Sequence, residues 1–170
     1  MNCPNCGAPL HLEEGRESLT CDYCKGVSQP EKNDDGVRVF DQPSELLCPI
    51  CQVPLLHAAI DRQRILYCPH CHGNLIPMAV FVILVDSLRA RRGGAVEIAP
   101  PPNPHELDRR IACPQCGGRM DTHCYAGGGN VVMDDCSRCE LNWLDSGELM
   151  SIARAPDHSI GEGSILDNEV

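Results

Sequence analysis

The sequence predicts a small, metal-stabilised α+β fold, and two observations support this prediction. Thirteen of the 170 residues are cysteine, and twelve of these form Cys-x-x-Cys pairs. Bulky core-forming side chains are scarce, because the chain has only one tryptophan, three tyrosines and two phenylalanines, against 15 glycines and 14 prolines. Chains that cannot build a large apolar core usually depend on metal ions or disulfides for stability.

The six Cys-x-x-Cys pairs, taken in chain order, make three sets of four cysteines. Each pair presents two thiolates from one tight turn, and two such turns complete a tetrahedral shell of four sulfur atoms. Glycine after the second cysteine, at Gly7 and Gly117, permits the positive φ from which backbone N–H groups point at sulfur. The pattern predicts three structural Zn²⁺ sites. Their predicted ligands are Cys3, Cys6, Cys21 and Cys24, then Cys48, Cys51, Cys68 and Cys71, then Cys113, Cys116, Cys136 and Cys139.

The start of the chain bears on whether these cysteines form disulfides instead. Met1 is followed directly by Asn2 and Cys3, without the basic start and apolar stretch of a signal peptide. We therefore expect a cytoplasmic protein, because a reducing compartment favours metal-bound thiolates over disulfides. The longest apolar run, from Leu75 to Val85, is too short to span a bilayer, so we expect no membrane interaction.

Each set of four cysteines is predicted to hold a β-hairpin, which makes each a zinc ribbon. The first ribbon covers residues 1–29, with two short strands around Glu14–Gly15. Residues 30–46 are rich in polar side chains and predict a linker. In the second ribbon, alternating apolar residues on either side of Asp61–Arg62 predict two strands and a turn.

The second ribbon, residues 47–92, is predicted to end in a strongly apolar helix over residues 77–92. Pro77 suits the first position of this helix, and Gly93–Gly94 ends it. An almost entirely apolar helix must be covered on more than one side. We expect it to be buried between the ribbons, against a second copy of the chain, or in a partner protein. The apolar residues concerned are Val80, Phe81, Ile83, Leu84, Val85 and Leu88.

A proline-rich linker is predicted over residues 93–110, and the third ribbon over residues 111–155. The hairpin of this ribbon turns at the three consecutive glycines of residues 127–129. Trp143 is predicted to be a core residue, because a base-stacking platform would need a neighbouring aromatic side chain. Residues 156–170 predict an acidic, disordered tail.

A helix is predicted at the end of the third ribbon, from about Ser146 to Arg154. Asp145 is the predicted N-cap, and Glu148, three residues later, is the matching acid of a capping box. This pattern also explains the two neighbouring carboxylates without assigning them a catalytic role.

The third ribbon has a specific motif, "ACPQCGGRMD … DDCSRCELNWLDSGELMSI", over residues 112–154. It closely resembles the transcription factor IIB-type zinc-ribbon family of small bacterial proteins. Leu141 departs from that pattern, which usually has glycine there. Residues 47–92 resemble a degenerate copy that keeps its four cysteines and Gly73, and residues 1–29 resemble only a generic ribbon. The resemblance implies zinc binding and leaves the activity open, because fold does not determine function.

The sequence favours a non-catalytic scaffold or adaptor over an enzyme. A shell of four cysteines has no open coordination position, which is typical of structural metal sites. The predicted partner is a protein, or a second copy of the chain, bound through helix 77–92. The histidines show no spacing with acids that suggests catalysis. His70 and His72 flank Cys71 without being needed as ligands, and Cys124 is the one cysteine outside the pairs.

Two alternatives remain open at this stage. The first is a nucleic-acid or transcription-machinery binder, which the net charge of −10 disfavours because it repels phosphate backbones. The second is a rubredoxin-like iron electron carrier, since four thiolates also bind iron. The basic residues available for nucleic acid are Arg62, Arg64, Arg89, Arg91, Arg92, Arg109 and Arg110.

Overall fold

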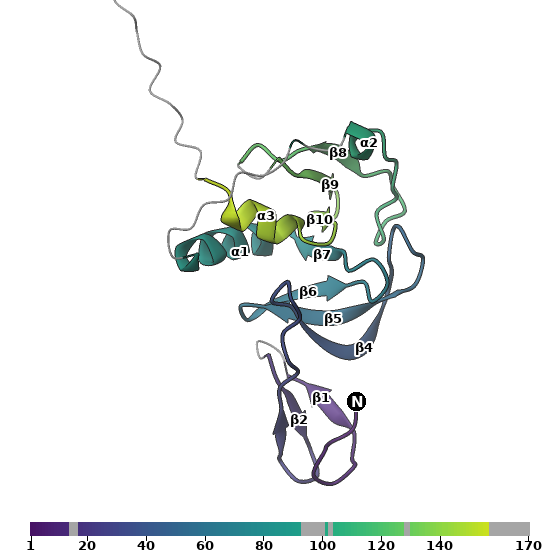
Figure 1. The fold of residues 1–170 in the computed structure, drawn as a ribbon. Coiled ribbons are helices and arrows are strands. Elements are labelled where there is room, and N and C mark those ends of the chain that lie inside the picture. The colour runs from purple at the N-terminus through teal and green to yellow at the C-terminus, as the bar shows by residue number, and fades with distance from the viewer. Residues whose placement is uncertain (14–16, 93–100, 102–103, 128–129, 157–170) are drawn as a thin grey trace, which may run out of the picture.

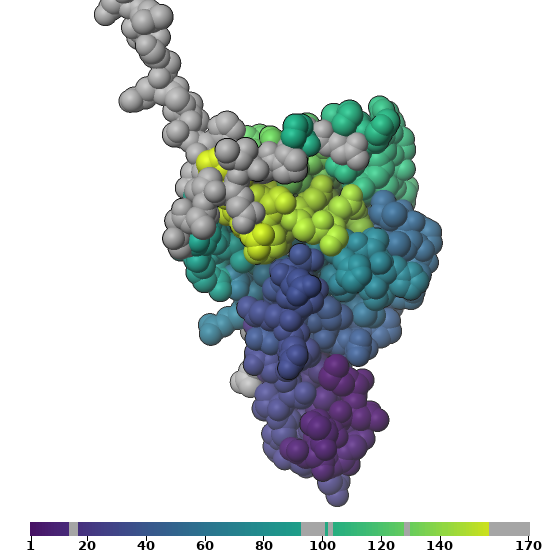
Figure 2. All heavy atoms as spheres, in the orientation of Figure 1, coloured from purple at the N-terminus to yellow at the C-terminus, as the bar shows by residue number. Residues whose placement is uncertain are grey.

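The computed structural model describes residues 1–13, 17–92, 101, 104–127 and 130–156, which form a small α+β fold with antiparallel sheets. The N-terminal part is a three-stranded sheet in the order β1-β2-β3. Its strands are β1 (Leu10–Leu12), β2 (Leu19–Cys21) and β3 (Val27–Ser28). This sheet and the segments around it form a lobe that projects from the larger body of the molecule (Figures 1 and 2).

The larger body is built on a seven-stranded sheet in the order β4-β5-β6-β7-β10-β9-β8. Every neighbouring pair in it is antiparallel. The strands are β4 (Arg38–Leu47), β5 (Pro54–Ile60), β6 (Gln63–Tyr67), β7 (Asn74–Pro77), β8 (Asp121–Cys124), β9 (Val132–Cys136) and β10 (Leu141–Leu144). The hairpins predicted for the second and third ribbons are β5-β6 and β8-β9.

The second and third of the expected tandem ribbons share one sheet, a connection that the sequence did not predict. Strand β7 ends the second ribbon, β10 ends the third, and the two pair with each other, so that Leu75 lies opposite Trp143. An unpaired strand edge exposes backbone N–H and C=O groups. Pairing the two edges satisfies these groups and merges both ribbons into one sheet.

The predicted linkers also contain regular structure. Residues 38–47, largely within the expected linker 30–46, form β4 and pair with β5. Val37 and Phe40 are fully buried there, so this segment belongs to the core. Within the expected linker 93–110, Pro104–Leu107 form the short helix α2, whereas residues 93–100, 102 and 103 lie outside the described residues. The expected acidic tail lies outside them from residue 157 onward.

Two helices cover one face of the large sheet and lie side by side (Figure 1). Helix α1 (Met78–Arg91) follows β7 and buries Phe81, Leu84 and Val85. Helix α3 (Glu148–Arg154) follows the third ribbon and buries Leu149, Ile152 and Ala153. The apolar helix predicted over residues 77–92 is thus covered on one side by its own chain. In the described part of the chain, no helix has both the length and the apolar character needed to cross a membrane.

A local two-fold relation connects the two helix-bearing ribbons. Leu75 is four residues after Cys71, as Trp143 is four residues after Cys139. In the sheet these two equivalent residues lie opposite each other, and the neighbouring pairs follow in register on both sides. The β7-α1 and β10-α3 units are therefore related by an axis through this pair.

The Leu75–Trp143 pair lies in a second core, on the side of the sheet that holds the cysteine turns. Trp143 is fully buried, which confirms its predicted role as a core residue. A Cβ atom on Gly73 would lie 2.3 Å from Cζ2 of Trp143, so only glycine fits there. Leu141 is equivalent to Gly73, but it packs in the same core as Leu75, which is smaller than Trp143. Because Leu75 leaves more room than Trp143 does, leucine is accommodated at position 141, where the related motif has glycine.

Candidate metal centres

All six Cys-x-x-Cys turns share one backbone conformation. The residue after the second cysteine is left-handed in each turn, at Gly7 (φ 74°), Lys25 (58°), Gln52 (57°), His72 (62°), Gly117 (69°) and Glu140 (55°). In five of them its N–H donates to the carbonyl of the first cysteine at 2.8–3.0 Å. This reversal of the chain places both thiols of a pair on the same side. The sequence indicated the positive φ only at the two glycines.

The twelve predicted ligands come together in three groups of four sulfur atoms. Within each group all Sγ atoms lie within 4.8 Å of one another. Sγ–Sγ distances are 3.5 Å for Cys3–Cys24, 3.6 Å for Cys48–Cys71 and 3.8 Å for Cys116–Cys136. A tetrahedral site with metal–sulfur bonds of about 2.3 Å requires sulfur atoms about 3.8 Å apart. These distances also exclude disulfides, whose sulfur atoms are about 2.05 Å apart. Each group therefore fits one metal ion.

Backbone N–H groups point at the sulfur atoms. The N–H of Cys51 donates to Cys48 Sγ at 3.2 Å, and that of His70 donates to Cys68 Sγ at 3.4 Å. Such bonds stabilise a thiolate relative to a thiol. The N–H of Gly118 is the largest cause that lowers the pKa of Cys116 to about 7. Part of the free energy of forming thiolates is thus supplied by the fold before a metal binds.

Burial acts in the opposite direction, because it disfavours charged sulfur. It raises the pKa of Cys48 to about 11. In the first group Cys6 and Cys24 are exposed, whereas their counterparts in the second group, Cys51 and Cys71, are partly buried. A divalent cation offsets both the desolvation and the mutual repulsion of four thiolates. The third group has one exposed ligand, Cys116, so the first group, with two, is the most accessible to solvent and chelators.

Comparison of the chain with models of known protein families, with curated proteins and with solved structures found no match. The likeness to the transcription factor IIB-type family therefore rests on the motif in residues 112–154. The structure supports a coarser statement: the chain has three Cys₄ clusters, consistent with zinc-ribbon-like metal-binding domains.

Asp145, the predicted N-cap of the last helix, has a different role. Its carboxylate accepts a hydrogen bond from Nε1 of Trp143 at 3.0 Å and forms an ion pair with Arg109. The residue before the helix is Gly147, with a φ of 81°, and no side chain caps the helix. The prediction was right in one respect, because Glu148 accepts the N–H of Asp145 at 2.6 Å. The helix consequently starts at Glu148, two residues later than expected.

Arg109 connects the segment before the third ribbon to its interior, a role that the sequence did not reveal. Its guanidinium binds both Asp145 and the fully buried Asp134. Burial lowers the pKa of Arg109, but hydrogen bonds to the two carboxylates outweigh that effect and raise it. Thr122 donates a further hydrogen bond to Asp134. A single, partly buried charge cluster thereby holds β8, β9 and the segment before α3 together.

The remaining candidate residues lie outside the metal centres. All three groups found among the described residues consist of cysteine alone, so neither His70 nor His72 belongs to one. The ring of His72 is instead hydrogen-bonded to the hydroxyl of Tyr67. Cys124 lies exposed on the edge strand β8.

Several arginines that are candidates for nucleic-acid binding make contacts within the chain. Arg89 donates to the carbonyl of Ile152 at 3.3 Å, and Arg92 donates to the carbonyls of Ala153 and Ala155. The last carbonyls of α3 lack partners in their own helix, so these arginines satisfy them. Arg64 lies over the ring of Phe40, at 4.9 Å from its centroid.

Proposed function

We propose that this protein is a non-catalytic, zinc-binding scaffold that presents its surface to a protein partner. One observation supports this proposal most strongly: three Cys₄ clusters, each with four thiols around one position. A shell of four thiolates leaves no coordination position for a substrate, which is the arrangement of structural zinc sites. In this proposal the metals maintain the fold, and the protein surface binds the partner.

Zinc is the proposed metal, with iron as the alternative, because tetrahedral four-sulfur sites suit both. Protein purified without added metal is expected to contain three zinc ions per chain by elemental analysis. A red protein with the visible absorption of ferric thiolate, and iron in place of zinc, would overturn the zinc assignment. The proposed cytoplasmic location is consistent with zinc, since reducing conditions keep cysteines free to bind it.

The proposed partner surface is the outer side of helix α1. Val82 is 59 % exposed and Ile83 is 49 % exposed, while the opposite side of the helix is buried. Ala79, Asp86 and Ala90 are exposed on the same side. Exposed apolar side chains that gather on one face often mark an interaction site. A partner protein or a second copy of the chain could cover this face.

Binding to nucleic acid is less well supported. The net charge of −10 opposes association with phosphate backbones. Arg89 and Arg92 are bound to carbonyl groups of α3, and Arg109 is bound to two carboxylates. These interactions account for three of the seven candidate arginines without a nucleic-acid ligand.

Affinity purification of the tagged chain, with and without nuclease, tests this proposal. We expect a protein partner that survives nuclease treatment and is lost in the double variant Val82→Lys/Ile83→Lys. The charge-matched control is Val27→Lys, compared with the single variants Val82→Lys and Ile83→Lys, because each adds one positive charge and Val27 is 65 % exposed on β3. Partners that disappear with nuclease would favour the nucleic-acid alternative. Equal recovery by all variants would show that α1 is not the binding surface.

A further inference from the structure

An apolar groove of about 260 Å³ crosses the middle strands of the large sheet. Its lining includes Leu66 of β6, Leu75 of β7 and Leu141 of β10, and all three contribute to the core around Trp143. Ile76, the strand neighbour of Leu75, belongs instead to the core that α1 and α3 cover. Because successive side chains of a strand point to opposite faces, the groove lies on the side of the sheet away from these helices.

The groove is a continuous surface of four neighbouring strands that is open to solvent. Leu66 lies opposite His57 on one side and Leu75 on the other, and Leu141 lies opposite Pro77. Leu75 is 2 % exposed, whereas His57, Leu66 and Pro77 are half-buried. The partly exposed apolar side chains offer a contact surface for another molecule.

The groove also has a cation without a matching anion. Among the described residues that line it, one is an arginine, Arg64, and none carries a carboxylate. Nη2 of Arg64 donates to the carbonyl of Glu13, and its buried Nη1 has no hydrogen-bond partner in the described part of the chain. The carboxylate that acts on Arg64, that of Glu17, forms its ion pair with Arg38 at 3.4 Å. Burial lowers the pKa of Arg64 more than Glu17 raises it, so a bound carboxylate would favour the charged form.

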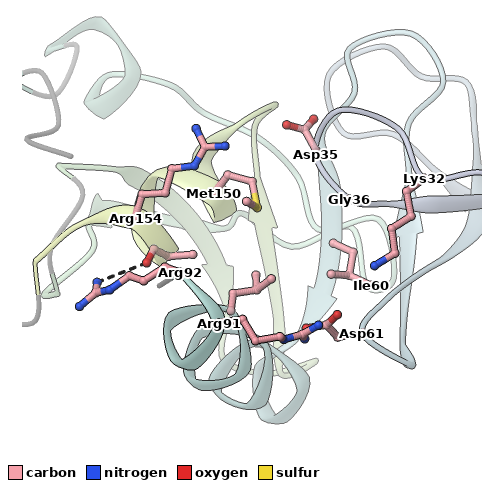
Figure 3. Close-up of a pocket in the computed structure, with 11 residues that line it drawn as sticks. Lys32, Asp35, Gly36, Ile60, Asp61, Arg91, Arg92, Met150 and Arg154 are labelled. Atoms are coloured by element: carbon pink, nitrogen blue, oxygen red, sulfur yellow. Dashed lines mark hydrogen bonds and ion pairs between the residues drawn. The ribbon is translucent and has the colours of Figure 1, made fainter. Parts of the chain in front are cut away.

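A different cavity, of about 280 Å³, lies between the loop before β4 and the C-terminal ends of α1 and α3 (Figure 3). Every arginine that lines it has a partner within the chain, as Arg91 has in Asp61. The remaining charged residues of its lining, Lys32 and Asp35, have opposite signs. This cavity therefore selects neither anions nor cations, whereas the sheet groove favours an anion beside an apolar group.

We propose that the sheet groove binds the C-terminal residue of a protein partner, with an apolar side chain against Leu66 and Leu75 and the terminal carboxylate at Arg64. A chain end joins an apolar side chain and a carboxylate in one residue, which matches the groove and its cation. Small-molecule sites usually enclose their ligand in about 300–1,000 Å³, whereas this smaller groove is open on a sheet face. The inference rests on the proposed partner-binding function but places the contact on the side of the sheet opposite Val82 and Ile83.

Fluorescence anisotropy with defined peptides tests this inference on the full, zinc-loaded chain. The probe is a Gly-Ser-Gly-Ser-Leu peptide, labelled at its N-terminus and with a free C-terminal carboxylate. Two matched probes carry a C-terminal amide or end in serine, and each change is expected to weaken binding at least about fivefold.

Two variants test the two halves of the groove. Leu46→Glu adds a carboxylate to the lining and is expected to weaken binding of the free-carboxylate probe at least about tenfold. The matched control is Leu47→Glu, because Leu47 is the next residue of β4, is 44 % exposed and lies outside the lining. Arg64→Gln is expected to abolish the preference for the free carboxylate over the amide. A purely structural role of Arg64 would instead weaken both probes alike.

Several outcomes would overturn the inference. Binding that is unchanged in Leu46→Glu, with zinc content and circular dichroism as in the wild type, would place the peptide elsewhere. Equal binding of the carboxylate and amide probes by the wild type would exclude recognition of a chain end. Octanoate that displaces the probe at a lower concentration than the unlabelled peptide does would make a small apolar acid the ligand. Binding only by a chain ending at Pro156 would make residues 157–170 the occupant, and no binding by either chain would remove the site.

The two proposals can fail separately. If the peptide binds as expected but affinity purification yields no protein dependent on Val82 and Ile83, the groove remains and the α1 surface fails. If a protein partner survives nuclease but no peptide binds, the scaffold function stands and the groove inference alone fails.

Discussion

Six residues with left-handed backbone, one after the second cysteine of every turn, bring the thiol pairs into position. Two of them are glycine, which adopts this conformation without steric cost. The other four are lysine, glutamine, histidine and glutamate, for which it is unfavourable by about 1 kcal/mol. At Lys25, Gln52 and His72 the N–H donates to the carbonyl of the first cysteine, as it does at the two glycines.

This conformation predicts opposite effects for two substitutions. Gly117→Ala is expected to destabilise the third ribbon by about 1 kcal/mol, since the added Cβ meets no atom within 4 Å and only the backbone is affected. Lys25→Gly is expected to stabilise the first ribbon by about 0.5–1 kcal/mol. Competition with a zinc chelator measures both changes. If Gly117→Ala holds zinc as tightly as the wild type, the shared turn conformation does not contribute to metal binding.

Glu148 predicts a pH dependence of stability. Burial raises its pKa to about 8, against an ordinary value near 4.5. A carboxyl whose pKa is raised on folding adds stability in its protonated form, and this contribution is lost as the pH rises through 8. Between pH 7 and pH 9 the wild type should therefore lose stability relative to Glu148→Gln. Urea denaturation in zinc-buffered solution measures this difference, and titration of the cysteines cancels in the comparison. Parallel curves for the two proteins would contradict the prediction.

At the scale of elements, the local hairpins could be predicted from sequence and the long-range pairing could not. The turn at Asp61–Arg62 follows from a short-range pattern, as do the strands on either side of the glycine run, of which residues 128 and 129 lie outside the described residues. In the sequence, the segment that forms β4 resembles a linker because polar residues and Pro43 interrupt its apolar pattern. The β7-β10 pairing depends on two edges that lie far apart in the chain, and nothing local specifies such a partner.

The packing around the Leu75–Trp143 pair of β7 and β10 predicts that substitution of Gly73 lowers stability and that a second substitution, at Trp143, restores much of it. Gly73→Ala is expected to cost about 2–3 kcal/mol, because its Cβ overlaps the indole of Trp143. The double variant Gly73→Leu/Trp143→Leu reproduces the Leu141–Leu75 arrangement on the other side of the local axis. It should recover much of the stability lost in Gly73→Leu alone, as measured by urea denaturation followed by circular dichroism. Additive losses in the double variant would refute the two-fold relation as an explanation of the packing.

At the scale of the whole molecule, the three metal centres are unequal. The second and third share one apolar core, to which Cys48, Cys68, Cys113, Cys136 and Trp143 all belong. The first has its own small sheet and a smaller core, completed by Phe40 and Ala59 from the large sheet. Its lobe projects from the body of the protein, as Figure 2 shows. The metals should therefore leave in steps, since a site can release its ion only as its surrounding core opens.

This inequality predicts the course of chelation, with the single tryptophan as a built-in reporter. A chelator is expected to remove one equivalent of zinc first, without changing the emission of Trp143, because Cys6 and Cys24 are exposed and far from its core. The other two equivalents should leave later and together, with a red shift of emission as the shared core opens. Cys24→Ser should abolish only the early step, while Cys124→Ser, outside the three clusters, should leave the course unchanged. Release of all three ions in one step, or an emission change during the first, would show that the lobe and the body unfold as one cooperative unit.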